Sequence, residues 1–262
     1  PQGSRNSRGK PIVNMFPLQQ GEKVNVVLPL TNGFRSFPPD HHVFMATAQG
    51  TVKKTPLEEF SNPRKAGIIA VDLDAGDYLI GAALTDGKHD VMLFSDGGKA
   101  VRFNEDEVRP LSRTARGVRG MMLDEGQSVI AMLVAEDESQ SVLTATQRGY
   151  GKRTPITEYT RHGRGTKGMI AIQQSERNGK VVAATLVRPD DEIMLITDRG
   201  VLVRTRVSEI RELGRATQGV TLIALDDGST LSGLQRIVEN DANGGDGNGN
   251  GHGDEPAPEE NP

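Results

Sequence analysis

The sequence predicts an all-β protein in which a four-stranded unit is repeated around an axis, as in propeller-like folds. Three observations favour this fold class. Four stretches align without a gap on shared glycines at intervals of 48, 51 and 51 residues. Short β-branched or apolar runs bounded by glycine turns fill each interval, and segments with a helical period are nearly absent. Four strands in a unit of nearly 50 residues are typical of one blade of a radial β fold.

Each unit opens with a predicted hairpin. The four aligned stretches are VFMATAQGTVKKT at 43–55, VMLFSDGGKAVRF at 91–103, VLTATQRGYGKRT at 142–154 and IMLITDRGVLVRT at 193–205. In each, a two-residue turn ends at a glycine, which accepts the positive φ that such turns require. We therefore expect two antiparallel strands in every unit, joined at Gly50, Gly98, Gly149 and Gly200.

Two further strands complete each unit after a longer polar loop. The third element reads KAGIIAVDL, VRGMMLDEG, TKGMIAIQQ and TQGVTLIAL, aligned on Gly67, Gly120, Gly168 and Gly219. The fourth reads YLIGAAL, SVIAMLV, VVAATLV and LSGLQRI. One short segment, Leu57 to Phe60, has the pattern of at most one helical turn.

These elements divide the chain into a partial repeat, four blades and a tail. We predict the second half of a blade over 1–41, complete blades over 42–88, 89–139, 140–190 and 191–238, and a tail over 239–262. The tail is acidic and rich in Gly, Asn and Pro, a composition that predicts disorder. On this division the chain begins inside a repeat, and four and a half repeats leave the closure of a ring open.

Composition narrows the classes of function. The chain has no cysteine, and no apolar run approaches the roughly 18 residues of a membrane span. With no signal peptide visible, we expect a protein of the reducing cytoplasm. The net charge is −4, but the tail holds seven acids and no Lys or Arg, so the rest of the chain has 31 basic against 28 acidic residues. No Ser/His/Asp or paired-carboxylate arrangement is recognisable, and we expect no catalytic residue and no metal ligand.

Basic residues recur at one offset in every repeat. Lys54, Arg102, Arg153 and Arg204 each lie four residues after the turn glycine. Because one offset means one location on each blade, we expect these cations to form an arc on the rim, thickened by the basic loops. A curved row of cations suits duplex DNA, whose neutralised phosphates release counterions and whose bending, about 1–6 kcal/mol for 40–90°, is offset by further contacts. The simpler alternative is that Lys and Arg at strand ends only keep a β surface soluble.

The predicted DNA-binding residues are the Lys and Arg of this offset, of its neighbours and of the loops. They are Arg8, Lys10, Lys53, Lys54, Arg64, Lys65, Arg102, Arg113, Arg116, Arg119, Lys152, Arg153, Arg161, Arg164, Lys167, Arg204, Arg206 and Arg215. Acids also recur, as Glu58, Glu107, Glu158 and Glu209, so the predicted rim is not uniformly positive.

Three other patterns suggest sites that we discount. Gly163, Gly165 and Gly168 match GxGxxG, but the match opens no helix and so predicts no dinucleotide site. The run from Asp40 to His42 has no distant metal-binding partner, and neighbouring strand residues point to opposite faces. Tyr150 and Tyr159 are too few for a single-strand stacking platform, and we expect them to pack or form hydrogen bonds.

The repeats resemble a known family. The resemblance lies in the stretches RGKPIVNMFPL, VFMATAQGTVKKTPLEEF, LTATQRGYGKRTPITEY, SERNG and ITDRGVLVRTRVSEI with GRATQGV. Over residues 1–238, the sequence is similar to the C-terminal domain of the DNA gyrase A protein. The resemblance implies a β-pinwheel, a propeller-like disc of six blades that exchange strands and wrap duplex DNA on a basic rim. The family's A-box, a glutamine before a glycine-rich basic cluster, belongs to a first blade that this sequence lacks. EYTRHGRGTKG is its nearest internal relative.

The resemblance also implies an assembly. It places this chain in a type IIA topoisomerase of two A and two B subunits that introduces negative supercoils in the bacterial cytoplasm, at the nucleoid. ATP and Mg²⁺ are implied for that holoenzyme and no cofactor for this chain, because the catalytic tyrosine and the ATPase site lie elsewhere. Two alternatives stay open: the C-terminal domain of a topoisomerase IV A-type subunit, which has fewer or more degenerate blades, and a propeller-like scaffold that binds proteins.

Overall fold

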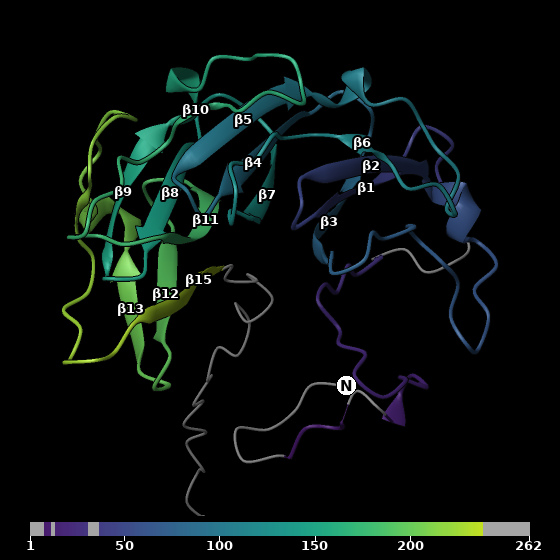
Figure 1. The fold of residues 1–262 in the computed structure, drawn as a ribbon, viewed down its shortest axis with the longest axis horizontal. Coiled ribbons are helices and arrows are strands. Elements are labelled where there is room, and N and C mark those ends of the chain that lie inside the picture. Colours follow the sequence, from purple (N-terminus) through teal and green to yellow (C-terminus); the bar gives the residue numbers. More distant parts are fainter. Residues whose placement is uncertain (1–7, 12–13, 31–36, 238–262) are drawn as a thin grey trace, which may run out of the picture.

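The computed structural model describes residues 8–11, 14–30 and 37–237 (Figure 1). The regular elements of that part of the chain are β-strands and short 3-10 turns, which confirms the predicted all-β, propeller-like fold. The predicted tail lies outside the described residues, and the blade boundaries drawn on the sequence stay a prediction.

Each full repeat contributes a hairpin, a 3-10 turn and a seven-residue strand. The hairpins are β1 (His42–Thr47) with β2 (Thr51–Pro56), β4 (Asp90–Ser95) with β5 (Lys99–Asn104), β8 (Ser141–Thr146) with β9 (Tyr150–Pro155), and β12 (Glu192–Thr197) with β13 (Leu202–Arg206). The turns are η3 (Leu57–Phe60), η4 (Glu105–Glu107), η5 (Ile156–Glu158) and η6 (Val207–Glu209). The long strands are β3 (Leu79–Thr85), β7 (Val129–Ala135), β11 (Val181–Val187) and β15 (Leu231–Ile237).

Neighbouring repeats exchange a short strand. The two-residue strands β6 (Val118–Arg119), β10 (Met169–Ile170) and β14 (Val220–Thr221) pair with β2, β5 and β9 of the preceding repeat. The sheets are therefore β3-β1-β2-β6, β7-β4-β5-β10, β11-β8-β9-β14 and, with three described strands, β15-β12-β13. A sheet does not coincide with one repeat, because its outermost strand comes from the next one.

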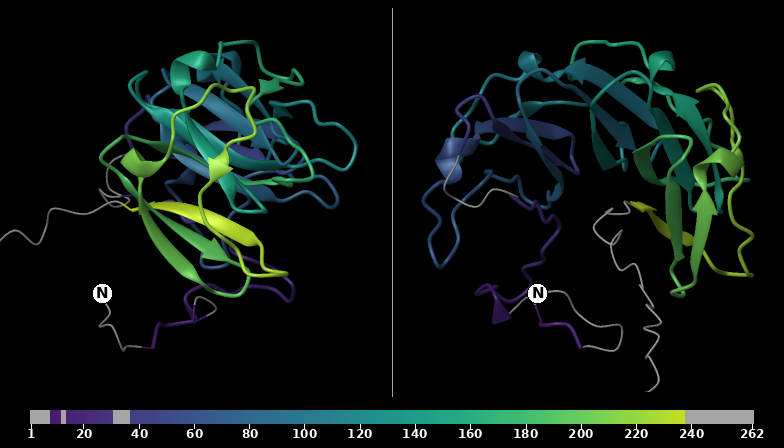
Figure 2. Two further views of the ribbon diagram at one scale, coloured as in Figure 1. Left: turned by 90° about the vertical axis from the view of Figure 1, so that its left-hand side faces the viewer. Right: turned by 180° about the vertical axis from the view of Figure 1, so that it is seen from behind.

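The four sheets are arranged in an arc (Figures 1 and 2). The long strands β3, β7, β11 and β15 lie on the inner side and contact one another in succession. The exchanged strands and the long loops lie on the outer edge. Apolar side chains fill the space between successive sheets, with Phe44, Leu93 and Phe103 fully buried between the first two.

The exchanged strands correct the alignment of the third element. The backbone of the first exchanged strand follows Gly117, whose φ is +113°, and not Gly120 as the sequence alignment suggests. Gly117, Gly168 and Gly219 are equivalent, at even intervals of 51 residues. A Cβ on any of them would lie 2.3–2.6 Å from a carbonyl oxygen of the preceding hairpin, so glycine is required for the close approach of the two chains.

Replacing the equivalent turn glycines Gly149 and Gly200 by alanine should measure the effect of strand exchange. Both have a φ near +80°, which costs an alanine about 1–2 kcal/mol. A Cβ on Gly149 would also lie 2.5 Å from the carbonyl oxygen of Ile223 beside β14, whereas a Cβ on Gly200 would meet nothing within 4 Å. Gly149→Ala should therefore lower the free energy of unfolding by about 1–3 kcal/mol more than Gly200→Ala in denaturant titrations. Equal losses would contradict the exchanged strand.

Candidate nucleic-acid interface

The cations of the recurring offset do not all lie on the surface. Lys54 and Arg102 are buried, Arg153 is half-buried, and Arg204 is exposed. The Lys54 ammonium donates to the carbonyl oxygen of Glu105 at 2.8 Å. Arg102 donates to the carbonyl oxygens of Ile156 and Tyr159 at 3.1 and 3.2 Å. Each buried cation thus binds the backbone at the 3-10 turn of the following repeat.

Backbone contacts explain this burial. The loop of the following repeat runs along the outer edge of the hairpin, where Leu111 donates its N–H to the carbonyl of Lys54, His162 to that of Arg102 and Leu213 to that of Arg153. The following repeat therefore covers the position that was predicted to be the rim. For Arg204 the described part of the chain contains no following loop, and its side chain stays about half exposed. The predicted exposure of Lys54 and Arg102 is wrong.

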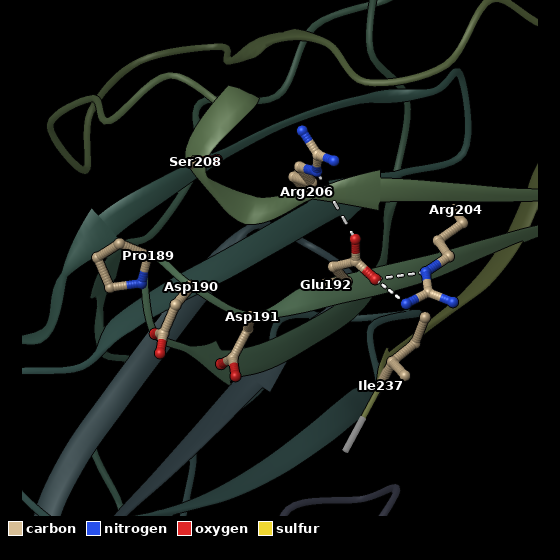
Figure 3. A pocket seen from close by; sticks show the side chains of 8 residues that line it. All are labelled: Pro189, Asp190, Asp191, Glu192, Arg204, Arg206, Ser208 and Ile237. Carbon is tan, nitrogen blue, oxygen red and sulfur yellow. Dashed lines mark hydrogen bonds and ion pairs between the residues drawn. The ribbon is translucent and has the colours of Figure 1, made fainter. Parts of the chain in front are cut away.

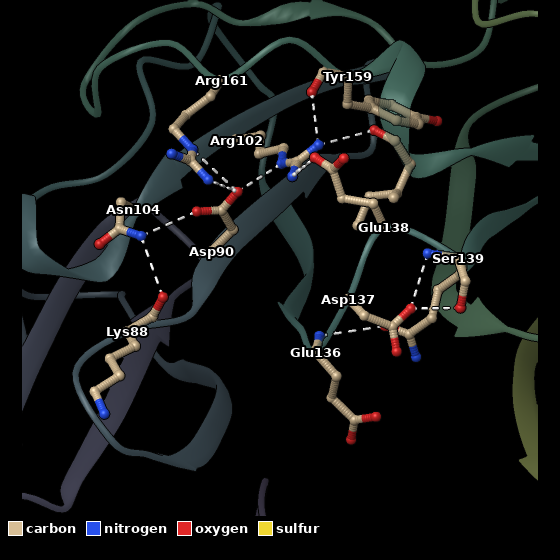
Figure 4. A network of polar contacts seen from close by, with 12 residues as sticks. Lys88, Asp90, Arg102, Asn104, Glu136, Asp137, Glu138, Ser139, Tyr159 and Arg161 are labelled. Carbon is tan, nitrogen blue, oxygen red and sulfur yellow. Dashed lines mark hydrogen bonds and ion pairs between the residues drawn. The ribbon is translucent and has the colours of Figure 1, made fainter.

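Arg102 is the centre of a charged network between the second and third sheets (Figure 4). Its Nε donates to Asp90 Oδ2 at 2.8 Å, and both side chains are more than nine-tenths buried. Arg161 donates to the same oxygen at 2.9 Å, and Asn104 donates to Asp90 Oδ1 at 3.1 Å. Burial by itself raises the pKa of Asp90, but the hydrogen bonds from Arg161, Arg102 and Asn104 outweigh it and hold the pKa below its usual value.

Two more predicted DNA-binding residues, Lys53 and Lys152, are also buried. The Lys53 ammonium donates to the carbonyl oxygens of Ala70, at 2.7 Å, and Arg113. The Lys152 ammonium donates to those of Gly214 and Arg215. Burial lowers the pKa of each lysine to about 8. Both are therefore unavailable to DNA on the surface, and the prediction that they lie on an exposed rim is wrong.

The basic loops repeat one contact at each junction. Arg164 donates its backbone N–H to Glu107 Oε2 at 3.1 Å, and its guanidinium donates to the carbonyl oxygens of Glu107 and Arg119 at 3.0 and 3.1 Å. Arg215 makes the same three contacts with Glu158 and the carbonyl of Ile170. In the preceding repeat, Arg113 donates to Glu59 Oε2 and to the carbonyl of Ile69. Of the recurring glutamates, Glu107 and Glu158 thus serve the joints between repeats, and in the first repeat Glu59 rather than Glu58 takes this position.

A second set of ion pairs also joins these loops to the preceding repeat. Arg116 forms an ion pair with Asp74, and Lys167 forms one with Asp124 at 2.6 Å. The stretch EYTRHGRGTKG accordingly has all three of its cations engaged with the preceding repeat, since Arg161 and Arg164 are bound as described above. Much of the positive charge that distinguishes this stretch joins repeats together.

In the last repeat, the predicted cations Arg204 and Arg206 contact one acid (Figure 3). Arg204 forms hydrogen-bonded ion pairs with Glu192, and the Arg206 Nε lies 3.8 Å from Glu192 Oε1. These side chains line an open cavity of about 470 Å³ together with Asp190 and Asp191. The acids make this cavity a poor site for phosphate.

The remaining predicted cations are exposed at the surface. Arg64, Lys65 and Arg119 lie on the outer loops and on β6, and they form no ion pair within residues 8–11, 14–30 and 37–237. Arg8 and Lys10 are exposed in the described part of the partial repeat. Arg116, Arg161 and Lys167 are exposed as well, although each has an acidic partner. We call Arg64, Lys65, Arg116, Arg119, Arg161 and Lys167 the outer-edge cations.

The sequence interpretation missed one exposed basic group. Arg148 in the β8–β9 turn is exposed, and the guanidinium of the exposed Arg177 lies 4.7 Å from the centroid of the Tyr150 ring. Hydrogen bonds from Arg177 and Thr221 lower the pKa of Tyr150. The signal was present, because Arg148 directly precedes a turn glycine, but it lies outside the recurring offset.

Two of the discounted patterns have structural roles. Tyr159 is buried and packs edge-on against Phe94, with ring centroids 5.9 Å apart, which confirms a packing role. His41 contacts its neighbour Asp40 at 2.9 Å.

In the described residues no helix is long and apolar enough to cross a membrane.

The fold and the outer edge together define a class of protein. An arc of propeller-like blades that exchange short strands is a β-pinwheel, and here it carries exposed cations on its outer edge. The chain belongs to the family described as DNA gyrase C-terminal domain, beta-propeller, whose model matches residues 41–86, 89–136, 140–188 and 191–237.

Relatives and solved structures agree with this family. The chain is 53% identical over 239 residues to the DNA gyrase A protein of Salmonella typhimurium and 51% identical to that of Escherichia coli. These matches cover 91% of this chain and 27% of the relatives, so the chain spans about a quarter of their length. A structure of the DNA gyrase A C-terminal domain matches with a TM-score of 0.70 and 28% identity, covering 78% of this chain and 68% of that one. The C-terminal domain of DNA topoisomerase IV matches in fold, with a TM-score of 0.81 and 24% identity, covering 87% and 70%.

Proposed function

We propose that this chain is the non-catalytic DNA-wrapping domain of a gyrase A protein, and that it bends duplex DNA around its outer edge. The observation that carries the proposal is the division of charge at that edge. Two of the recurring acids, Glu107 and Glu158, accept hydrogen bonds in the joints between repeats, whereas Arg64, Lys65 and Arg119 face solvent without an acidic partner in the described residues. Exposed cations on successive blades of an arc suit a bent phosphate backbone.

The same proposal includes the assembly. As part of a gyrase A protein, the chain would act with the rest of that protein and with gyrase B, in an assembly of two A and two B subunits in the bacterial cytoplasm, at the nucleoid. ATP and Mg²⁺ would be used by other parts of that holoenzyme during strand passage.

The alternative of a topoisomerase IV protein has less support. The topoisomerase IV domain is the better match in shape, but its sequence identity is 24%, whereas the gyrase A relatives reach 53%. A scaffold that binds proteins through the flat faces would not need solvent-exposed cations on the outer edge.

A topology assay tests the proposal. Relaxed nicked plasmid is incubated with the chain, sealed by ligase, freed of protein and resolved on a gel. Wrapping with one preferred hand should shift the mean linking number in proportion to the protein added, and the shift should disappear as salt rises, because phosphate contacts release counterions. A salt-sensitive mobility shift of linear duplex without any change in linking number would mean that the chain holds DNA but does not wrap it.

A further inference from the structure

Three side chains with metal-binding atoms meet at the junction of the first two sheets. Asp86 and His89 lie in the connection from β3 to β4, and Glu105 begins the turn η4 after β5. One ligand atom of each residue lies within 4.8 Å of the other two. In the described part of the chain this is the only such group of three His, Asp or Glu residues. Glu105 is distant in sequence from Asp86 and His89, so no local sequence motif predicts this group.

Glu105 occupies a position that is apolar in every other repeat. The first residues of the four 3-10 turns are Leu57, Glu105, Ile156 and Val207, and all four are buried. Glu105 has no exposed surface at all. Its carboxylate accepts hydrogen bonds from the Thr85 hydroxyl at 2.7 Å and from the backbone N–H of His89 at 2.9 Å. A buried carboxylate is costly without compensating charge or hydrogen bonds, and here these two hydrogen bonds and the nearby Lys54 ammonium lower that cost.

His89 directs its Nδ1 at this carboxylate. Its Nδ1 lies 2.8 Å from Asp86 Oδ1 and 3.7 Å from Glu105 Oε1. That nitrogen is buried, and it is not aligned for a regular hydrogen bond with either oxygen. In the next repeat, the equivalent residue is Gln140, whose side-chain oxygen accepts the N–H of Glu136. The first junction therefore differs from the second in having an imidazole nitrogen between two carboxylates.

We propose that Asp86, His89 and Glu105 bind a divalent transition-metal cation of the zinc type. One imidazole nitrogen and two carboxylate oxygens are a donor set that Zn²⁺ accepts, and three protein ligands leave a fourth position for water. Asp86 and His89 line an open cavity of about 390 Å³, from which that water would enter. The cation would offset the two carboxylate charges and would tie the β3–β4 connection to η4. This site is independent of the proposed binding of DNA.

Equilibrium dialysis of the full chain after chelator treatment tests the site, with Zn²⁺ as the probe and Co²⁺ as a spectroscopic substitute. Three variants remove one ligand each: Glu105→Gln, His89→Gln, which introduces the residue of the next repeat, and Asp86→Asn, which alters a partly exposed side chain. Each should bind one equivalent of Zn²⁺ less than the unaltered chain, or bind it at least tenfold more weakly. The visible absorption of tetrahedral Co²⁺ should be lost with it.

Asp137→Asn is the matched control, because Asp137 lies three residues before Gln140 as Asp86 lies three before His89. It should leave the stoichiometry and the Co²⁺ spectrum unchanged. Circular dichroism confirms that each variant is folded, and Asp86→Asn keeps the test decisive if a buried substitution unfolds the chain. An unaltered chain that binds no Zn²⁺, or variants that bind as much as it does, would overturn the proposal.

Discussion

Replacing Arg102 by methionine is expected to lower the free energy of unfolding by about 3–5 kcal/mol. Methionine fills much of the same volume but removes the guanidinium that binds Asp90 and the carbonyls of Ile156 and Tyr159. The carboxylate of Asp90 would stay buried with only Arg161 and Asn104 as partners. A urea titration followed by circular dichroism measures the loss.

Arg204→Met is the matched control, since Arg204 occupies the same offset in the last repeat. Its side chain is about half exposed and paired with Glu192, so its loss should cost less than about 1 kcal/mol. Similar losses for both variants would contradict the burial and clamping role of Arg102. The folded fraction of Arg102→Met should bind DNA with unchanged affinity, because the guanidinium lies between two sheets. Weaker DNA binding by the folded protein would mean that Arg102 takes part in the DNA interface.

Neutralising Arg64, Lys65 and Arg119 together to glutamine is expected to weaken DNA binding by one to several orders of magnitude at low salt. Each phosphate contact adds about 0.9 to the slope of log affinity against log salt, so the slope should fall by up to about 2.7. These side chains have no acidic partner in the described part of the chain, and their removal leaves no buried charge unpaired. The free energy of unfolding should therefore stay within about 0.5 kcal/mol.

Lys88→Gln with Arg236→Gln removes two positive charges, against three in the triple variant, and serves as the control for loss of charge away from the outer edge. Lys88 lies in the connection between β3 and β4, and Arg236 lies on the inner strand β15, both away from the outer edge. The control should keep the affinity and the salt slope almost unchanged. If it weakened binding as much as the triple variant, the interaction would depend on overall charge and not on the outer edge. A folded triple variant with unaltered affinity would exclude Arg64, Lys65 and Arg119 from the interface.

The salt-dependent part of binding should rest on few residues. Four of the predicted cations are buried: Lys53, Lys54, Arg102 and Lys152. Three more donate hydrogen bonds to the preceding repeat: Arg113, Arg164 and Arg215. These residues recur at fixed intervals because the same kind of contact between neighbouring repeats is formed at each junction. Selection for a stable arc and selection for DNA binding therefore produce similar patterns of basic residues, and exposure separates them.

The sequence by itself determined the repeat, the all-β fold and the family. The regular spacing of Gly50, Gly98, Gly149 and Gly200 is sufficient to identify the repeat. Each of these glycines supplies the positive φ of a hairpin turn, and this requirement does not depend on what packs around the turn. The hairpins follow from apolar residues on both sides of each turn. These are local properties, and local properties can be seen in a single chain.

Only the tertiary structure decided which strands and cations face one another. The exchanged strands have two residues each, too few to show a period, and their partners lie in the preceding repeat. Lys54 and Arg204 lie at the same offset from their turn glycines, so the sequence placed them at equivalent points of their blades. It could not indicate that the following repeat covers Lys54 and leaves Arg204 exposed. The approach of Glu105 to Asp86 and His89 likewise depends on how η4 folds back over the β3–β4 connection. Burial and charge pairing depend on neighbours distant in sequence, and those neighbours were found only in the folded arc.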